Sequence, residues 1–218
     1  MRELNGQHHY VRAYEYDEEH GALLLERIQP GTTLKLEPSL ERRLAVFMDI
    51  WQSSHIALRE PTLFKSYFQM TEDAAKKKWA CGENPELRRV ALLMTSVCGD
   101  LYNKYSERFL LHGDLHGDNL LKNIHGDYII VDPHARIGPP VCDLGRYITN
   151  EYNDADKANC ASVVEFVIAK MSASSKLPEI DIKRAFFVDA TLMTCWDAED
   201  GAVNLDCVNY AVTLLRKS

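Results

Sequence analysis

The chain has 218 residues, and its 25 Lys and Arg against 32 Asp and Glu give a formal net charge of −7. A chain of this length buries roughly 70% of its unfolded surface, and 46% hydrophobic residues can supply that core, so disorder is excluded. The acidic balance argues against a nucleic-acid partner, because phosphate contacts need a basic surface. The one compact basic cluster, three lysines at 76–78, is interpreted as a solvated helix end.

Cysteine spacing and hydropathy indicate the compartment. The six cysteines are scattered and form no C-x-x-C pair, which fits a reducing cytosol better than a disulfide framework or a zinc site. The first residues are polar and lack the apolar core of a signal peptide. No stretch approaches the ~18 consecutive apolar residues of a membrane helix. We therefore expect a soluble, cytoplasmic protein with no membrane partner.

The first predicted element is a β-hairpin. Residues 10–16 alternate in polarity, residues 17–21 suit a polar turn, and residues 22–28 are typical of a second, more buried strand. Gln29, Pro30 and Gly31 are expected to end that strand.

Three helices are predicted next. Ser39 suits the N-cap of a helix that reaches about residue 58, before Pro61. A second helix is expected to open near Thr71 and to close near Gly82. Beyond Pro85, apolar residues on one helical face predict a long helix through about residue 106.

Two short strands, residues 109–111 and 127–132, enclose the one segment that carries chemistry, and helical patterns dominate from Cys142 onward. Asp114 and Asn119 lie five residues apart on the loop after the first strand, and Asp132 lies at the exit of the second. Phosphoryl transfer needs a carboxylate that accepts the proton of the attacking hydroxyl, together with oxygen ligands for magnesium. The spacing predicts Asp114 as the base and Asn119 with Asp132 as the magnesium ligands.

Other interpretations of this segment stay open. His112 and His116 could form a metal pair of a hydrolase, since alternate strand residues share a face, although Gly113 and Gly117 favour a tight loop. Asp118 is expected to be a solvent-facing loop residue.

The stretch His112-Gly-Asp-Leu-His-Gly-Asp-Asn119 resembles the catalytic loop of the aminoglycoside phosphotransferase and choline kinase family, the small-molecule branch of the protein-kinase-like fold. The segment from Val131 to Arg146 resembles the metal-binding aspartate and the following helix of that branch. With the hairpin end at residues 24–27 and the late residues 195–201, the chain is most similar to the streptomycin 6-kinase and hydroxyurea-resistance kinase group. The resemblance implies an α+β fold in which residues 1–28 are a truncated N-terminal lobe and residues 29–218 form a mostly helical catalytic and substrate-binding lobe.

The same resemblance implies a reaction and its site. It implies transfer of the γ-phosphate of ATP, with Mg²⁺, to a hydroxyl of a small molecule. The expected acceptor is a cationic aminosugar such as streptomycin, and the expected role is antibiotic resistance. The resemblance gives Asp143 a bracing role in the catalytic loop, whereas the residue type alone equally allows a simple helix N-cap there. His112 is expected to brace the loop as well. The other implied residues are the adenine contacts, Leu25 with the backbones of Glu26 and Ile28, and an acidic acceptor rim beside Trp196 formed by Asp197, Glu199 and Asp200.

One departure from the family pattern affects nucleotide binding. Residues 1–21 contain only Gly6 and Gly21, so they carry no glycine-rich phosphate loop, and no strand lysine is followed by a helix glutamate. ATP binding is therefore expected to be weak, in a chain that is either shortened or has lost half of its nucleotide lobe. The alternative from another class is a non-catalytic binding module, and the third is the metal hydrolase.

Overall fold

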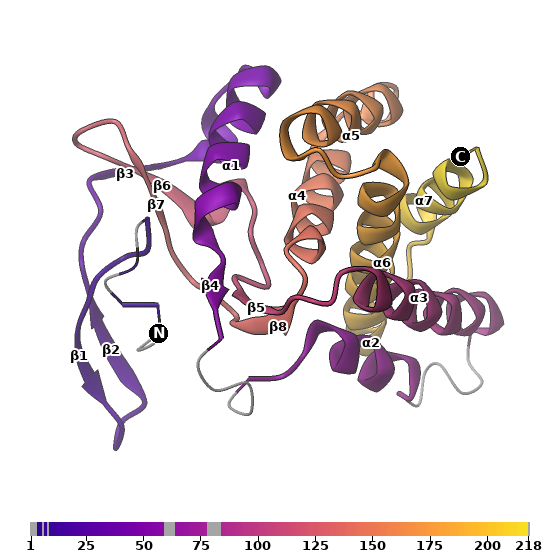
Figure 1. Ribbon diagram of the computed structural model, residues 1–218, viewed down its shortest axis with the longest axis horizontal. Coiled ribbons are helices and arrows are strands. Elements are labelled where there is room, and N and C mark those ends of the chain that lie inside the picture. The colour runs from indigo at the N-terminus through magenta and orange to yellow at the C-terminus, as the bar shows by residue number, and fades with distance from the viewer. Residues whose placement is uncertain (1–3, 6, 8, 59–63, 78–83, 218) are drawn as a thin grey trace.

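The computed structural model of the chain describes residues 4–5, 7, 9–58, 64–77 and 84–217. Strands from the N-terminal segment and from the middle of the chain lie beside a larger body of helices (Figure 1). Among the described residues, no helix is both long enough and apolar enough to cross a membrane. The five cysteines described are free thiols.

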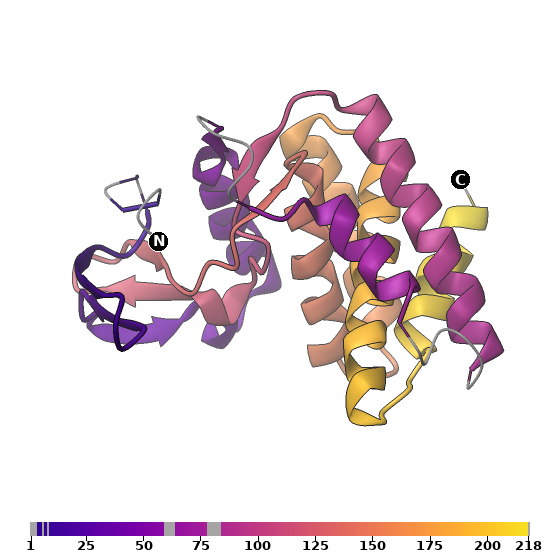
Figure 2. The same cartoon turned by 90° about the horizontal axis from the view of Figure 1, so that it is seen from below.

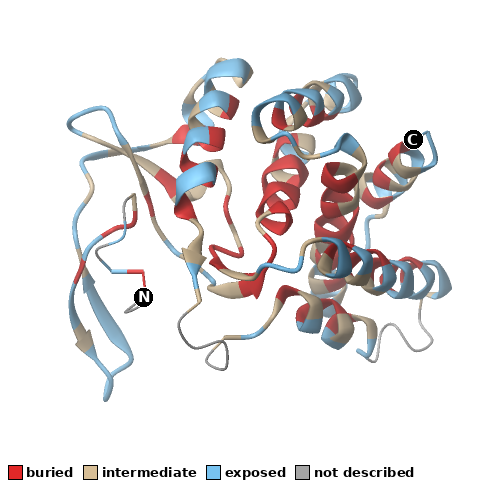
Figure 3. Ribbon diagram, viewed as in Figure 1, coloured by how far each residue is buried: buried red, intermediate tan, exposed pale blue. Residues whose placement is uncertain are grey.

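The predicted N-terminal hairpin is confirmed, but its burial was predicted wrongly. Strands β1 (Ala13–Asp17) and β2 (Ala22–Leu25) pair antiparallel. The second strand is not the more buried one, because Leu23 and Leu24 are 45% and 57% exposed. These two strands form a separate two-stranded sheet among the described residues, and most of the hairpin is solvent-exposed (Figure 3).

A three-stranded sheet joins the N-terminal segment to the middle of the chain. Strand β2 ends at Leu25, three residues before the predicted end, and Pro30, which was predicted to end it, begins strand β3 (Pro30–Thr33). Strand β3 pairs with β6 (Leu120–Asn123), which pairs with β7 (Tyr128–Ile130). Tyr10 lies outside β1, contrary to the prediction, and forms an isolated parallel bridge to the end of β7. This sheet therefore holds β6 and β7, which follow the loop of residues 112–119, against β3 and Tyr10 of the N-terminal segment.

A second small sheet has the order β4-β5-β8. It contains β4 (Ile56–Ala57), the predicted β5 (Phe109–Leu111) and β8 (Arg136–Gly138). Helix α1 (Leu40–Ser54) begins after the predicted N-cap, Ser39, whose Oγ accepts the Arg42 amide at 3.3 Å. The helix ends four residues before the predicted end because the following residues pair with β5.

The next two helices differ in how well their starts were predicted. Helix α2 (Tyr67–Ala75) begins four residues before Thr71, where Ser66 Oγ accepts the Gln69 amide at 2.9 Å. A side-chain cap, rather than acidic residues at the helix dipole, sets this start. The long helix α3 (Pro85–Lys104) confirms the prediction. Some residues used in the predictions lie outside the described ones, among them Gly6, Pro61, Lys78, Cys81 and Gly82.

The predicted C-terminal helices are confirmed as α4 (Val141–Asp154), α5 (Cys160–Ser175), α6 (Glu179–Asp197) and α7 (Asp206–Arg216). Helices α4 and α6 lie side by side in the centre of this body (Figure 2) and are its most buried elements (Figure 3). The start of α4 lies against the loop of residues 112–119, because Asp143 in its first turn accepts the His112 and Gly113 amides.

Gly145 sets how closely α4 approaches α6. A Cβ atom at this position would lie 2.3 Å from the Ala185 carbonyl oxygen and 3.0 Å from Asp189 Cβ. We expect Gly145→Ala to lower the free energy of unfolding by about 1–3 kcal/mol or more, because one helix must move away from the other. The matched control is Gly99→Ala in α3, where the added Cβ would lie 3.4 Å from the Phe68 ring. That change should be neutral or stabilise by up to about 1 kcal/mol through helix propensity. Urea denaturation of both variants measures this, and equal stabilities would contradict the packing argument.

Candidate active site

The loop between β5 and η4 (Gly117–Asn119) is anchored by a buried carboxylate. Asp143 Oδ2 accepts the His112 amide at 3.1 Å and Oδ1 accepts the Gly113 amide at 2.9 Å. Asp143 is 1% exposed and lies in the first turn of α4, whose N-cap position is held by Pro140. The bracing geometry is therefore present, and the alternative that Asp143 is the N-cap is wrong. The loop also requires glycine at position 113, because Gly113 has φ +80° and a Cβ there would lie 2.6 Å from Arg136 Cγ.

His112 has both ring nitrogens engaged. Its Nδ1 accepts the Asp114 amide at 3.1 Å, so Nε2 carries the proton and donates to the Val131 carbonyl at 2.9 Å. Burial lowers the pKa of His112, and the opposing effect of Asp143 does not restore it. A neutral histidine with both nitrogens engaged has no lone pair for a metal ion. Among the described residues, no group of three or more His, Cys, Asp and Glu side chains could hold a metal ion.

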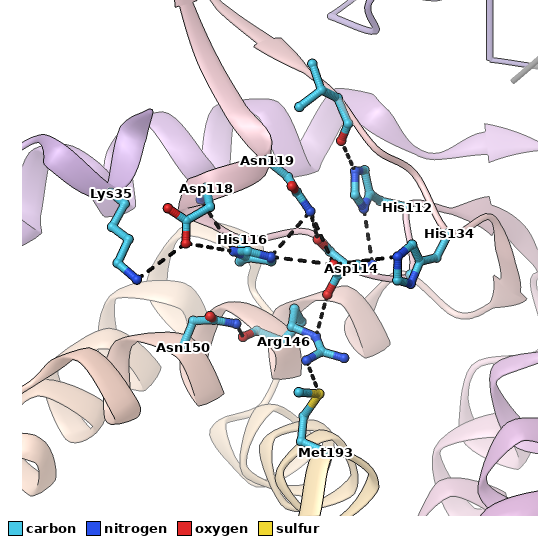
Figure 4. Close-up of polar contacts among 12 residues, drawn as sticks. Lys35, His112, Asp114, His116, Asp118, Asn119, His134, Arg146, Asn150 and Met193 are labelled. Atoms are coloured by element: carbon cyan, nitrogen blue, oxygen red, sulfur yellow. Dashed lines mark hydrogen bonds and ion pairs between the residues drawn. The ribbon is translucent and has the colours of Figure 1, made fainter. Parts of the chain in front are cut away.

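Asp114 lies at the centre of a cluster of polar contacts (Figure 4). Its Oδ1 is 3.0 Å from Arg146 Nε, and its Oδ2 lies 3.5 Å from His116 Nε2 and 3.9 Å from His134 Nε2. Burial alone would raise the pKa of Asp114, but the His116 hydrogen bond and the Arg146 charge outweigh burial and lower it. The carboxylate is therefore held in its ionised form, as a proton acceptor must be.

Asn119 lies beside Asp114, as the motif predicts. Its Nδ2 donates to the Asp114 carbonyl at 2.9 Å and lies 3.3 Å from the Asp114 Oδ2. Because the amide nitrogen faces Asp114, the amide oxygen faces away from it. The Asn119 carbonyl accepts the Val131 amide at 3.0 Å, and the exposed Asp132 is the next residue after this backbone contact.

The predicted adenine-binding residues lie at the end of the hairpin. Leu25 is half-buried and pairs with Ala13, while Ile28 is half-buried beyond the strand. The Glu26 amide donates to the Arg12 carbonyl at 2.8 Å, so this amide is already engaged within the protein. A nucleotide would have to use the Glu26 carbonyl instead, and the adenine contact stays a prediction.

The predicted acceptor residues do not form one rim. The Trp196 ring faces the guanidinium of Arg146, with 5.7 Å between the Arg146 Cζ and the ring centre. Glu199 pairs with Lys77 at 2.6 Å. Asp197 lines a cavity of about 510 Å³ between α4, α6 and α7, whereas Asp200 is exposed in η5 (Ala198–Asp200).

Two charged residues near Asp114 were not predicted as part of the site. Arg146 and Asp189 are 4% and 0% exposed on the facing sides of α4 and α6, and the Arg146 Nε lies 3.4 Å from the Asp189 Oδ1. Asp189 lies within the mostly apolar run of residues 185–193, and a single charge in such a run is a signal of buried pairing. The identity of the partner depends on tertiary packing, which the sequence alone does not show.

A family model described as aminoglycoside/hydroxyurea antibiotic resistance kinase matches residues 4–201. The chain belongs to this family. The predicted resemblance to this group is confirmed, and the non-catalytic module and the metal hydrolase are not supported.

Two curated relatives are similar to this chain over most of its length. It is 26% identical to streptomycin 6-kinase of Streptomyces griseus over 197 residues, covering 88% of this chain and 63% of the relative. It is 24% identical to hydroxyurea phosphotransferase of Kitasatospora aureofaciens over 204 residues, covering 89% of this chain and 56% of the relative. The chain therefore spans about three fifths of the length of these relatives.

Similar solved structures show the fold of this chain. The choline kinase LicA of Streptococcus pneumoniae matches with a TM-score of 0.62 and 16% identity, over 96% of this chain and 75% of the other. Aminoglycoside phosphotransferase APH(3'')-Id of Streptomyces rimosus, solved with ADP and streptomycin, matches with a TM-score of 0.56 and 14% identity, over 84% of this chain and 75% of the other. The predicted α+β protein-kinase-like fold is confirmed. The boundary between lobes at residue 28 stays a prediction.

The side-chain oxygens of Asn119 and Asp132 are suitable ligands for Mg²⁺. Mg²⁺ prefers carboxylate and carbonyl oxygens and keeps several of its waters. Asp132 is exposed and Asn119 is partly exposed, so an ion bound by both could also keep waters and phosphate oxygens. This donor set differs from the nitrogen and sulfur ligands that zinc sites use.

Asp132 also adopts an unfavourable backbone conformation, with φ +54°. A non-glycine residue in the left-handed region is strained by about 1 kcal/mol or more, and such strain is often kept at functional sites. We expect Asp132→Gly to leave the free energy of unfolding unchanged or to raise it by up to about 1 kcal/mol, while phosphoryl transfer is lost. Thermal unfolding and a turnover assay on the same preparation measure both effects. A destabilised variant that keeps its turnover would contradict both the strain and the metal-ligand assignment.

Proposed function

We propose that this chain is the catalytic part of a kinase that transfers the γ-phosphate of ATP to a hydroxyl group of a small molecule and confers antibiotic resistance. Family membership supports the reaction class. The observation that carries the proposal is the ionised Asp114 carboxylate, held within hydrogen-bond distance of Asn119 on a loop that the buried Asp143 anchors. A cytoplasmic location and the absence of a nucleic-acid partner stay predictions from the sequence.

Each residue of this site has a separate task in the proposed reaction. Asp114 orients the acceptor hydroxyl and accepts its proton as the oxygen–phosphorus bond forms. Its Oδ2 suits this task, because it faces His116, His134 and Asn119, whereas Oδ1 faces Arg146. The Asn119 amide oxygen and the Asp132 carboxylate would hold Mg²⁺, which supplies positive charge to the phosphate oxygens when it is bound.

The hydrogen bonds of the loop that carries Asp114 hold this residue in position for the proposed reaction. Transition states of phosphoryl transfer are loose and highly charged, so catalysis depends on positioning and on charge neutralisation more than on covalent chemistry. The two backbone hydrogen bonds to Asp143 and the two ring hydrogen bonds of His112 fix the backbone that leads into Asp114. These contacts pre-organise the base before substrates bind.

The proposed acceptor is a cationic aminosugar of the streptomycin type. Its support is the similarity to a streptomycin 6-kinase and to a phosphotransferase solved with streptomycin. The cavity beside Asp197 adds a suitable surface, since Asp206 and three asparagines, on α4, on α7 and before α7, also line it, beside a single cation among the described lining residues, Lys157. Carboxylates attract amino and guanidino groups, and amides bind sugar hydroxyls.

A transfer assay tests this function. The chain is incubated with ATP and MgCl₂ and, in separate reactions, with streptomycin, a second aminoglycoside, or hydroxyurea, and the products are examined by mass spectrometry. We expect streptomycin to gain the mass of one phosphoryl group, only with magnesium present. If hydroxyurea alone were phosphorylated, the proposed kinase activity would stand, but the proposed aminosugar acceptor would be wrong. No phosphorylated product from any acceptor would contradict the function for this chain.

A further inference from the structure

Arg146 is the one charged group of α4 that contacts the proposed base. Its side chain is 5% exposed, and its Nε lies 3.0 Å from Asp114 Oδ1 and 3.4 Å from Asp189 Oδ1. Among the described residues, the Nε–H is aligned for a hydrogen bond with neither carboxylate, so the contact is an ion pair shared between the two. One buried cation therefore links the catalytic loop to α6.

The other side of Arg146 is held just as firmly. Its Nη1 contacts the Met193 sulfur, and its guanidinium faces the Trp196 ring (Figure 4 shows the Met193 contact). Asp189 is held in turn by the Tyr67 hydroxyl, which donates to Oδ1 at 3.0 Å. A planar guanidinium can pair with carboxylates at its edge while it faces an aromatic ring, which an ammonium group cannot do as well. The orientation of Arg146 is thus fixed by α2 and α6 together.

The position of Arg146 separates the two oxygens of Asp114. Oδ1 faces the buried guanidinium, and Oδ2 faces Asn119, His116 and His134. Without a cation at Oδ1, the carboxylate could rotate about its side-chain bonds and exchange the two oxygens. We propose that Arg146 is a positioning residue, which locks the Asp114 carboxylate so that Oδ2 faces the incoming hydroxyl. This inference rests on the proposed role of Asp114 as the base.

The buried location creates a difficulty for the simplest variant. Removing Arg146 alone leaves Asp189 buried without a counter-charge, which strongly destabilises a protein. The double variant R146M/D189N removes both charges of the α4–α6 pair and keeps the side-chain volumes close to the originals. D189N alone leaves Arg146 to Asp114, and the Asn oxygen can still accept the Tyr67 hydroxyl. Comparing these two variants separates positioning of Asp114 from stability of the helix pair.

The matched control is another partly buried arginine, Arg184, which lies on α6. Arg184 pairs with the buried Asp181 at 3.3 Å, and Asp181 keeps Lys104 and Tyr105 as partners when Arg184 is replaced. We expect R184M to keep the turnover of the unaltered chain. We expect R146M/D189N to lower kcat about 10²-fold relative to D189N, with KM for ATP changed less than twofold, because misplacing a reacting group by about 1 Å costs that much.

A spectroscopic measurement tests the contact without any need for turnover. In the full chain labelled with ¹⁵N-arginine, the Nε–H resonance of Arg146, assigned by its loss in R146M/D189N, should shift in D114N and in D189N but not in D127N. A resonance that moves only in D189N would show that Arg146 serves the helix pair alone, and would overturn the inference. A double variant with the kcat of D189N would overturn it as well. Should the unaltered chain phosphorylate no acceptor, the proposed function fails, and the resonance of Arg146 still decides whether it holds Asp114.

Discussion

Replacing Asp114 with asparagine is expected to lower kcat for phosphoryl transfer by about 10²–10⁴-fold, the usual contribution of a general base. Asparagine keeps the shape of the side chain and can still accept a contact from Arg146, but its amide cannot accept the proton of the attacking hydroxyl. Arg146 also keeps Asp189 as a counter-charge 3.4 Å away, so the variant should remain folded. The KM for ATP should change little, because Asp114 is assigned to the acceptor hydroxyl and not to the nucleotide.

Steady-state kinetics with saturating ATP measure this effect, and thermal unfolding reports whether the fold is intact. The control is Asp127→Asn, which changes an exposed carboxylate in the turn between β6 and β7. Its turnover should stay within about twofold of the unaltered chain, as usual for surface positions away from a site. Equal turnover in the Asp114 and Asp127 variants would rule out Asp114 as the base.

Replacing Asp143 with alanine is expected to have the largest effect on stability, a loss of about 3–5 kcal/mol in the free energy of unfolding. The carboxylate accepts two backbone amides, from His112 and Gly113, and each buried donor left unsatisfied costs about 1–3 kcal/mol. His55, whose side chain is 8% exposed, lies 3.7 Å from Asp143 and would lose the same neighbour. Turnover should fall together with stability, because the loop that carries Asp114 loses its anchor.

Urea denaturation of three variants tests this account. Asp143→Asn keeps one oxygen acceptor and should fall between the unaltered chain and Asp143→Ala. Asp49→Asn, at an exposed position of α1, should change the free energy of unfolding by less than about 0.5 kcal/mol. An Asp143→Ala variant as stable as the Asp49 variant would show that the loop does not depend on this carboxylate.

The sequence predicted those parts of the fold whose signals are local. The N-cap Ser39, the long apolar face of α3 and the hairpin turn depend on neighbouring residues, and the structure confirms all three. Strands β3, β4 and β8 escaped prediction, because each has only two to four residues and pairs with a strand far away in the sequence. The exposure of Leu24 was missed for the same reason, since burial depends on which layer covers a strand.

The candidate site shows the same division. The proximity of Asn119 to Asp114 could be predicted because a motif fixes both on one loop, and the structure places Asn119 beside Asp114. The roles of these two residues and of Asp132 stay predictions. Arg146 could not be predicted, because its contact with Asp114 depends on how α4 packs behind the loop. The acidic residues after Trp196 are neighbours in sequence, but helix packing directs Glu199 to Lys77 and Asp197 to a separate cavity.

Calorimetric titration with ATP, with and without magnesium, tests the central assignment most directly, because it separates the metal ligands from the base without an acceptor. We predict that the unaltered chain and D114N bind Mg-ATP with the same Kd, that D132N binds at least tenfold more weakly, and that removing magnesium abolishes this difference. ATP binding of equal strength in all three proteins, with or without magnesium, would contradict the assignment of Asp132 as a magnesium ligand and of this site as the place of phosphoryl transfer.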